Sequence, residues 1–238
     1  MTLPRFTIGN RFSGQPVLPG CDFVPDVIVA GLSDHPQPTD DDPNTWTLED
    51  SLRDNLLPRI QADGLHDLVL AAEESPWPVA KLDRISQWCR YVGVTCWAYG
   101  LGMDGDANCG DMRADDSAGY ELWKQERRSL LPRLPLSFNL AYDLYIQEDE
   151  TLTHWLVNKT ELARTLIELY PDRRILPIVW HRSNRPPYRP LPVGLFRAMV
   201  RWAAMAHGRV RWWFDEQDSV KAWDANDPYV KAFMEEAA

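Results

Sequence analysis

The chain has 238 residues, of which 45% are hydrophobic and 25% charged, as in a globular protein with one large domain or two small ones. Its formal net charge of -10 argues against a nucleic-acid backbone or an anionic membrane surface as a partner. No segment approaches the roughly 20 apolar residues that span a bilayer, and residues 1–20 lack the pattern of a secretory signal. We therefore expect a cytoplasmic protein or a component of a non-secreted assembly.

Short apolar runs alternate with amphipathic segments along the chain, and there is no internal repeat. The short runs are typical of buried strands, and the periodic segments are typical of helices. The expected strands cover residues 6–12, 26–31, 68–73, 94–99, 136–145, 175–180 and 210–214. The expected helices cover residues 48–62, 81–92, 118–131, 153–169, 193–206 and 228–236, and Gly208 is placed to end the fifth of them.

Strands separated by helices imply right-handed crossovers and a parallel sheet. We expect an α/β fold: a compact or incomplete (β/α) TIM-like barrel formed as a single domain by residues 26–238. An N-terminal arm over residues 1–25, which includes the first expected strand, precedes it. The alternative is an open, doubly wound sheet, but no glycine-rich phosphate-binding motif follows any strand, so a nucleotide-binding version has little support.

The cysteines show no C-x-x-C pair and no histidine at ligand spacing, which argues against a zinc site. We expect four free thiols in a reducing compartment, with Cys89 and Cys96 buried, and no metal or other cofactor. A weaker alternative is an α/β enzyme for a phosphorylated or metal-bound small molecule. In that case His35 with Asp34, or His181, would begin a metal site.

The most informative segment is 68–78, with the sequence Leu-Val-Leu-Ala-Ala-Glu-Glu-Ser-Pro-Trp-Pro. A short apolar run that ends in two carboxylates is typical of a buried parallel strand that opens into a pocket, and parallel α/β folds place their chemistry at this end. Side chains alternate along a strand, so Glu73 shares a face with Ala71 and Glu74 lies on the other face. Only one of the two glutamates can therefore point into the pocket while the strand stays regular, and both stand where a catalytic acid would stand.

Carboxylates, tyrosines and tryptophans also dominate the other predicted strand ends, and the chain contains eleven tryptophans. This combination favours carbohydrate as the partner, because carboxylates move protons and aromatic faces stack on sugar rings. Since Tyr142 and Asp143 are neighbours on one strand, only one of them is expected to serve the site. The further catalytic candidates are Asp143 and Asp215. The substrate-binding candidates are Glu74, Trp77, Tyr99, Tyr142, Trp180, Arg182 and Trp213.

The segments 69–78, 136–145, 174–181, 212–215 and 223–229 together resemble hyaluronidase-like glycoside hydrolase barrels, over about residues 65–235. In that family a strand ends in Asp-x-Glu, the Glu is the proton donor, and the Asp orients the acetamido group of the substrate. The resemblance implies that Glu73 is the donor. Ala71 stands where the family has its Asp, so Asp143, Asp215 or Tyr142 would have to take over the orienting role.

Two main functions follow. The first is a glycoside hydrolase for an amino sugar, in which Trp77 and Trp97 form a partly apolar pocket that raises the pKa of Glu73. The second is a barrel that has lost catalysis and serves as a carbohydrate-binding or structural component beside other protein subunits. Ala71 favours the second function, whereas the clustered acidic and aromatic strand ends are common to both.

Overall fold

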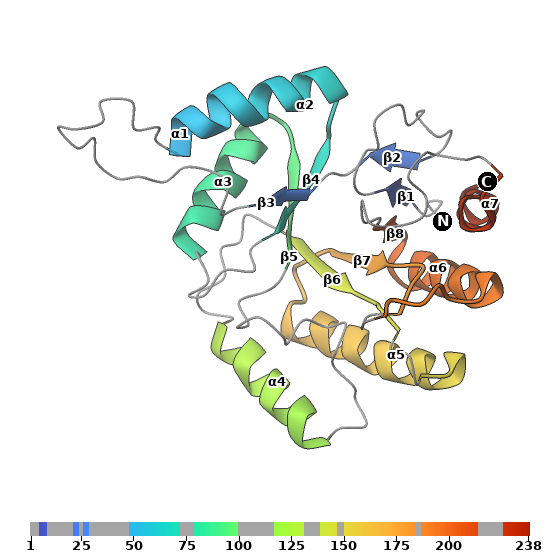
Figure 1. The fold of residues 1–238 in the computed structure, drawn as a ribbon. Helices are drawn as coiled ribbons and strands as arrows, with labels where there is room; N and C mark the ends of the chain where they lie inside the picture. Colours follow the sequence, from blue (N-terminus) through green and yellow to red (C-terminus); the bar gives the residue numbers. More distant parts are fainter. Residues whose placement is uncertain are drawn as a thin grey trace.

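The computed structural model describes residues 5–8, 21–23, 26–28, 48–71, 79–99, 117–130, 139–146, 150–183, 187–213 and 226–238. Three strands come first among the described elements, and from β4 onward strands and helices alternate along the chain (Figure 1). The strands are β1 (Arg5–Ile8), β2 (Cys21–Phe23), β3 (Asp26–Ile28), β4 (Asp67–Ala71), β5 (Thr95–Tyr99), β6 (Asn139–Asp143), β7 (Ile175–Val179) and β8 (Arg209–Trp212). The helices are α1 (Leu48–Ser51), the π-helical turn Leu52–Leu56, α2 (Leu57–Asp63), α3 (Val79–Tyr91), α4 (Ser117–Leu130), α5 (Leu152–Leu169), α6 (Val193–His207) and α7 (Pro228–Ala237).

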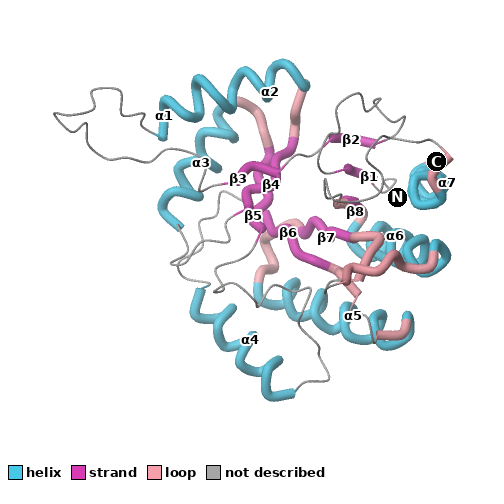
Figure 2. The backbone as a smooth tube through the Cα atoms, viewed as in Figure 1, coloured by secondary structure: helices cyan, strands magenta, loops and turns pink. Residues whose placement is uncertain are grey.

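The strands form one sheet in the order β2-β1-β8-β7-β6-β5-β4-β3, and every neighbouring pair is parallel. Its two edge strands are consecutive in the chain, because β2 ends at Phe23 and β3 begins at Asp26. Three peptide links span at most about 11 Å, so the two edges of the sheet lie close together. The sheet therefore curls into a barrel-like fold, with helices around its outside (Figure 2).

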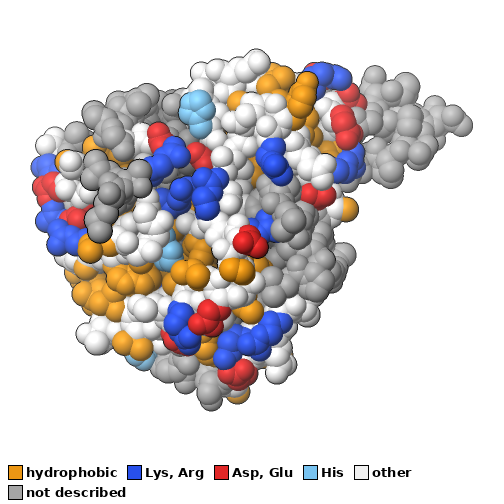
Figure 3. All heavy atoms as spheres, turned by 180° about the vertical axis from the view of Figure 1, so that it is seen from behind, with side chains coloured by type: hydrophobic (Ala, Val, Ile, Leu, Met, Phe, Trp, Pro, Cys, Tyr) orange, Lys and Arg blue, Asp and Glu red, His pale blue; other side chains and the backbone are white. Residues whose placement is uncertain are grey.

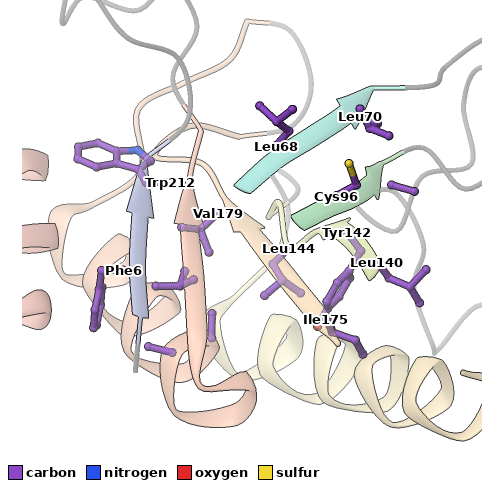
Figure 4. Packing of buried hydrophobic residues seen from close by; sticks show 14 of the residues in the cluster. Phe6, Leu68, Leu70, Cys96, Leu140, Tyr142, Leu144, Ile175, Val179 and Trp212 are labelled. Atoms are coloured by element: carbon purple, nitrogen blue, oxygen red, sulfur yellow. The ribbon is translucent and has the colours of Figure 1, made fainter. Parts of the chain in front are cut away.

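Side chains on the strands alternate between two hydrophobic clusters. The outer cluster packs the sheet against the helices, and the members labelled in Figure 4 are Phe6, Leu68, Leu70, Cys96, Leu140, Tyr142, Leu144, Ile175, Val179 and Trp212. The inner cluster fills the concave side of the sheet with Val69, Trp97, Ala141, Tyr145, Leu176, Ile178 and Trp180, against which Tyr99 and Trp213 pack. A parallel sheet covered in this way on both faces explains why its strands appear as continuous apolar runs.

Helix ends follow local sequence signals. Gly208 has a φ of 66° and stops α6 directly after His207, as its sequence position predicts. Thr151 begins α5 with a side chain that accepts a hydrogen bond from the backbone N–H of His154. Asp227 caps α7 by accepting from the N–H groups of Tyr229 and Val230. These caps fix where each helix meets the strand that precedes or follows it.

The N-terminal residues contribute to the sheet itself. The expected strand over 6–12 appears as β1, which lies between β2 and β8. β2 falls within the segment expected as an arm and was not predicted, so this arm supplies two strands of the sheet. Cys89 and Cys96 are buried as predicted. No helix among the described residues combines the length and apolarity needed to cross a membrane.

Candidate functional site

The carboxyl ends of β5 and β6 carry a polar pair. Tyr99 and Asp143 are the last residues of these strands, and the Tyr99 hydroxyl donates to Oδ2 of Asp143 over 2.9 Å. Asp143 is only 1% exposed. A phenol hydroxyl that donates to a buried carboxyl oxygen fixes the orientation of the carboxyl group.

A buried arginine lies level with this pair on the concave side of the sheet. Asp143 is in register with Ile178 on β7, and Ile178 is in register with Arg211 on β8. Residues in direct register on parallel strands face the same side, and Ile178 belongs to the inner cluster. Arg211 is fully buried. The sequence reasoning missed it, although the alternation Arg211, Trp212, Trp213 places it on the same face as the predicted Trp213.

Aromatic rings lie beyond this layer, at the ends of β6, β7 and β8. The ring centroid of Trp180 lies 5.7 Å from that of Tyr145 and 5.0 Å from that of Trp213, and the centroids of Tyr145 and Trp213 are 6.2 Å apart. Tyr188 adds a fourth ring, with its centroid 5.6 Å from that of Trp180. We call these four residues the aromatic cluster. Its rings range from buried Tyr145 and Trp180 to Tyr188, which is 41% exposed, so the cluster reaches from the core to solvent.

The segment after β7 holds Tyr188 in place. Its backbone pairs by hydrogen bonds from Ser183 N to Arg189 O and from Leu191 N to His181 O, each 2.9 Å long. Nη1 of Arg182 donates to the carbonyl oxygen of Tyr188 over 3.1 Å. Tyr188 has a φ of 52°, a backbone conformation that residues other than glycine rarely adopt. Arg182, expected to bind substrate, therefore contacts the backbone of an aromatic residue that the sequence reasoning missed.

Tyr142 does not join this group. It belongs to the outer cluster, and its hydroxyl forms a 2.9 Å hydrogen bond with Nε2 of His207 on α6. The alternation along β6 thus separates Tyr142 from Asp143, and Asp143 is the one that lies with Tyr99. Burial lowers the pKa of His207 to about 4, so this histidine is neutral near pH 7.

The indole of Trp97 leans toward the amino-terminal ends of the strands, and Glu73, its predicted neighbour, lies outside the described residues. Its indole Nε1 donates over 2.8 Å to Oδ1 of Asp67, the first residue of β4. The side chain is buried and belongs to the inner cluster. A strand's periodicity indicates which face a residue occupies and not how far a large ring leans along the barrel.

Four of the predicted site residues, Glu73, Glu74, Trp77 and Asp215, lie outside the described residues. The described part of β4 ends at Ala71, which is in register with Tyr99 on β5. His181, an alternative metal ligand, is buried against α6 and α7, and its Nδ1 accepts from the indole N–H of Trp212 over 3.3 Å. In the described part of the chain, no three His, Cys, Asp or Glu side chains gather closely enough to hold a metal ion.

No family model and no curated protein sequence matches this chain. Among solved structures it is similar to bee venom hyaluronidase, with 10% identity and a TM-score of 0.48 over 89% of this chain and 66% of that one. For bee venom hyaluronidase in complex with a hyaluronic acid tetramer, the values are 12% identity and a TM-score of 0.40, over 81% of this chain and 78% of that one.

A third similar structure is D-psicose 3-epimerase in the presence of D-fructose, with 12% identity and a TM-score of 0.28 over 76% of this chain and 89% of that one. These similarities are distant. They concern the course of the backbone and assign no role to any residue of this chain.

Proposed function

We propose that this chain is a glycoside-hydrolase-like barrel that binds a carbohydrate at the carboxyl ends of β5 to β8. The observation that carries the proposal is the juxtaposition there of the Tyr99–Asp143 pair and the aromatic cluster. Sugar rings present apolar C–H faces and polar rims, which match partly exposed indole and phenol rings beside a fixed carboxylate. Trp213 and Tyr188 supply the more accessible rings for stacking.

Within this proposal Glu73 is the general acid. Val69 lies in the inner cluster, and continuing the alternation of β4 for two residues beyond Ala71 directs Glu73 to the same side. A general acid at neutral pH needs a pKa above that of an ordinary glutamate, and apolar surroundings provide such a shift. The proposed reaction protonates the oxygen of the glycosidic bond as that bond breaks.

Asp143 is the proposed second carboxylate. Ala71 supplies no carboxylate at the position that hyaluronidase-like barrels use to orient the acetamido group, whereas Asp143 is held by Tyr99 at the end of a nearby strand. Asp215 is the alternative for this role. A separation of about 5 Å between the two carboxyl groups would predict retention of configuration, and ~6.5–9.5 Å would predict inversion.

The catalytic half of the proposal is tested with Glu73→Gln and the matched control Glu168→Gln, which removes a carboxylate from the solvent side of α5. The assay measures reducing ends released from a hyaluronan tetrasaccharide and from chitotetraose. We expect Glu73→Gln to lower the rate by about 10²–10⁴-fold and the control to leave it unchanged, because a positioned acid contributes this much. An undiminished rate in Glu73→Gln would remove Glu73 from the mechanism.

The binding half is tested separately by calorimetric titration of the same two oligosaccharides. Trp213→Ala should weaken binding about tenfold or more, because truncation of an aromatic anchor commonly costs more than 1 kcal/mol. Met205→Ala on α6, where Met205 is 76% exposed, should leave the affinity unchanged. Trp213-dependent binding without release of reducing ends would support the inactive, carbohydrate-binding alternative. An affinity that Trp213→Ala leaves unchanged would contradict the proposed location of the site.

A further inference from the structure

The amino-terminal ends of the strands, opposite the proposed carbohydrate site, carry a second cluster of charges around Trp97. Arg5 Nη2 lies 2.6 Å from Oδ2 of Asp22 and 3.6 Å from Oδ2 of Asp67, and Trp97 donates to Asp67. Both carboxylates of the cluster are therefore already engaged, by the Arg5 guanidinium and, for Asp67, by the indole N–H as well.

Arg174 and Arg209, the arginine pair, lie over the same indole. The guanidinium carbon of Arg174 is 5.2 Å from the centroid of the Trp97 ring, and that of Arg209 is 4.7 Å from it. Arg174 directly precedes β7, and Arg209 is the first residue of β8. Trp97 is buried, so the arginine pair covers the ring at this end of the barrel.

Among the described residues, no carboxylate contacts the arginine pair directly. Neither arginine forms an ion pair with a carboxylate in the described part of the chain, although Arg174 donates to Oδ1 of Asn139. Burial lowers the pKa of Arg209, and the neighbouring charges of Arg174 and Arg5 lower it further, whereas the nearby Asp67 carboxylate acts in the opposite direction. The guanidinium groups of Arg174 and Arg209 thus both lie close to the Trp97 ring, and an anion bound beside them would offset the repulsion between their like charges.

We propose that Arg174 and Arg209 bind a small oxyanion of the phosphate type at the amino-terminal mouth of the barrel. A phosphate group offers several oxygens and up to two negative charges, and guanidinium groups match such oxygens with parallel N–H donors. The cluster holds three guanidinium groups and two carboxylates, in a chain whose net charge is -10. On the face seen in Figure 3, basic side chains likewise gather in separate groups beside acidic ones.

This proposal is independent of the carbohydrate site and is tested by calorimetric titration at constant ionic strength set with sodium chloride. The probes are inorganic phosphate and glucose 6-phosphate. The probe that binds with the higher affinity shows whether the site prefers a free oxyanion or a phosphomonoester. We expect saturable binding by the wild type and at least a tenfold loss of affinity in Arg174→Gln and in Arg209→Gln. Arg164→Gln on α5, which removes an exposed arginine paired with Glu161 and Glu168, is the matched control and should bind as the wild type does.

Arg174 is exposed, so its substitution tests the site even if Arg209→Gln does not fold. The thermal midpoint of the wild type should also rise with phosphate concentration, because a ligand that binds only the folded state stabilises it. The absence of saturable binding of both probes to the wild type would overturn the proposal. Undiminished binding by the Arg174→Gln, Arg209→Gln double variant would overturn it as well.

Discussion

At the residue scale, the hydrogen bond between Tyr99 and Asp143 joins two strand ends that are 44 residues apart in the chain. The carboxylate is almost fully buried, so its orientation depends on its hydrogen-bond donors. We infer that Tyr99 acts as a positioning residue for Asp143. A sugar hydroxyl or acetamido group that meets Asp143 would then find an acceptor oxygen already oriented, which lowers the cost of ordering it on binding.

Tyr99→Phe removes this donor and keeps the ring. We expect the free energy of unfolding to fall by about 1–3 kcal/mol, the usual cost of depriving a buried acceptor of its hydrogen-bond partner. The measurement is urea denaturation followed by tryptophan fluorescence. Tyr91→Phe makes the same chemical change at a residue that is 89% exposed, and it should alter stability by less than about 0.5 kcal/mol. Equal effects of the two substitutions would contradict a structural role for the bond.

At this scale, the sequence predicts which face of the sheet each strand residue occupies. The alternation separated Tyr142 from Asp143, and the structure places them with His207 and with Tyr99, respectively. It could not predict Tyr188, because its position depends on the backbone pairing of the segment after β7 and on a left-handed φ. Nor could it predict the level of Trp97, which depends on contacts with Asp67 and the arginine pair.

At the scale of elements, β6 and α6 are linked through a histidine that stays neutral. Tyr142 on β6 shares a hydrogen bond with His207, the last residue of α6, and burial lowers the pKa of this histidine from 6.5 to about 4. The unfolded chain takes up a proton below about pH 6.5, whereas the folded chain does so only near pH 4. The contribution of neutral His207 to the free energy of unfolding is therefore fully present above pH 6.5, and it is lost as the pH falls toward 4.

His207→Gln removes the titration and keeps a polar partner for Tyr142. The wild type should lose up to about 3 kcal/mol more unfolding free energy than this variant between pH 7 and pH 4. Urea denaturation at a series of pH values measures the difference. His66→Gln makes the same substitution at an exposed histidine and serves as the matched control. Parallel pH curves for the wild type and His207→Gln would show that His207 is not held neutral.

Helices were more predictable than strands. The helix expected over 153–169 appears as Leu152–Leu169, because its apolar positions repeat with helical spacing and Thr151 begins it. β2 was not predicted, because it has only three residues and because its strand conformation depends on pairing with β1. The expected helix over 48–62 appears as α1, a π-helical turn and α2, and this local change leaves no signal in the apolar pattern.

At the scale of the whole molecule, α7 links the two ends of the chain. Phe233 on α7 packs against Phe6 on β1, with ring centroids 5.7 Å apart, and against Trp212 on β8, at 5.1 Å. Glu236 adds a hydrogen-bonded ion pair with Arg201 on α6. Because β1 lies between β2 and β8, this packing supports the part of the sheet where the chain begins and ends.

Phe233→Ala should destabilise the fold by about 3–5 kcal/mol, because it leaves a cavity at a fully buried site that joins both ends of the chain. Chemical denaturation gives the value. Met205→Ala removes a side chain of similar length from the solvent side of α6 and should cost less than about 0.5 kcal/mol. A small effect of Phe233→Ala would mean that the sheet does not depend on α7.

The alternation of strands and helices predicted a parallel α/β fold, and the register of the strands shows how the sheet curls. No sequence pattern could predict that the chain positions β2 and β3 at opposite edges of the same sheet, because this depends on pairing with β1 and β4. The sequence predicts that Tyr99, Asp143, Trp180 and Trp213 lie at strand ends. Which of them lie together depends on the pairing of the strands, and only the fold shows it.

The most direct test of the carbohydrate site is a crystal structure of the Glu73→Gln variant with a bound amino-sugar oligosaccharide. It should show a sugar ring stacked on Trp213 or Tyr188, and the amide of residue 73 within hydrogen-bond distance of a glycosidic oxygen. A residue 73 side chain that points away from the concave side of the sheet, or an oligosaccharide bound elsewhere, would contradict the account.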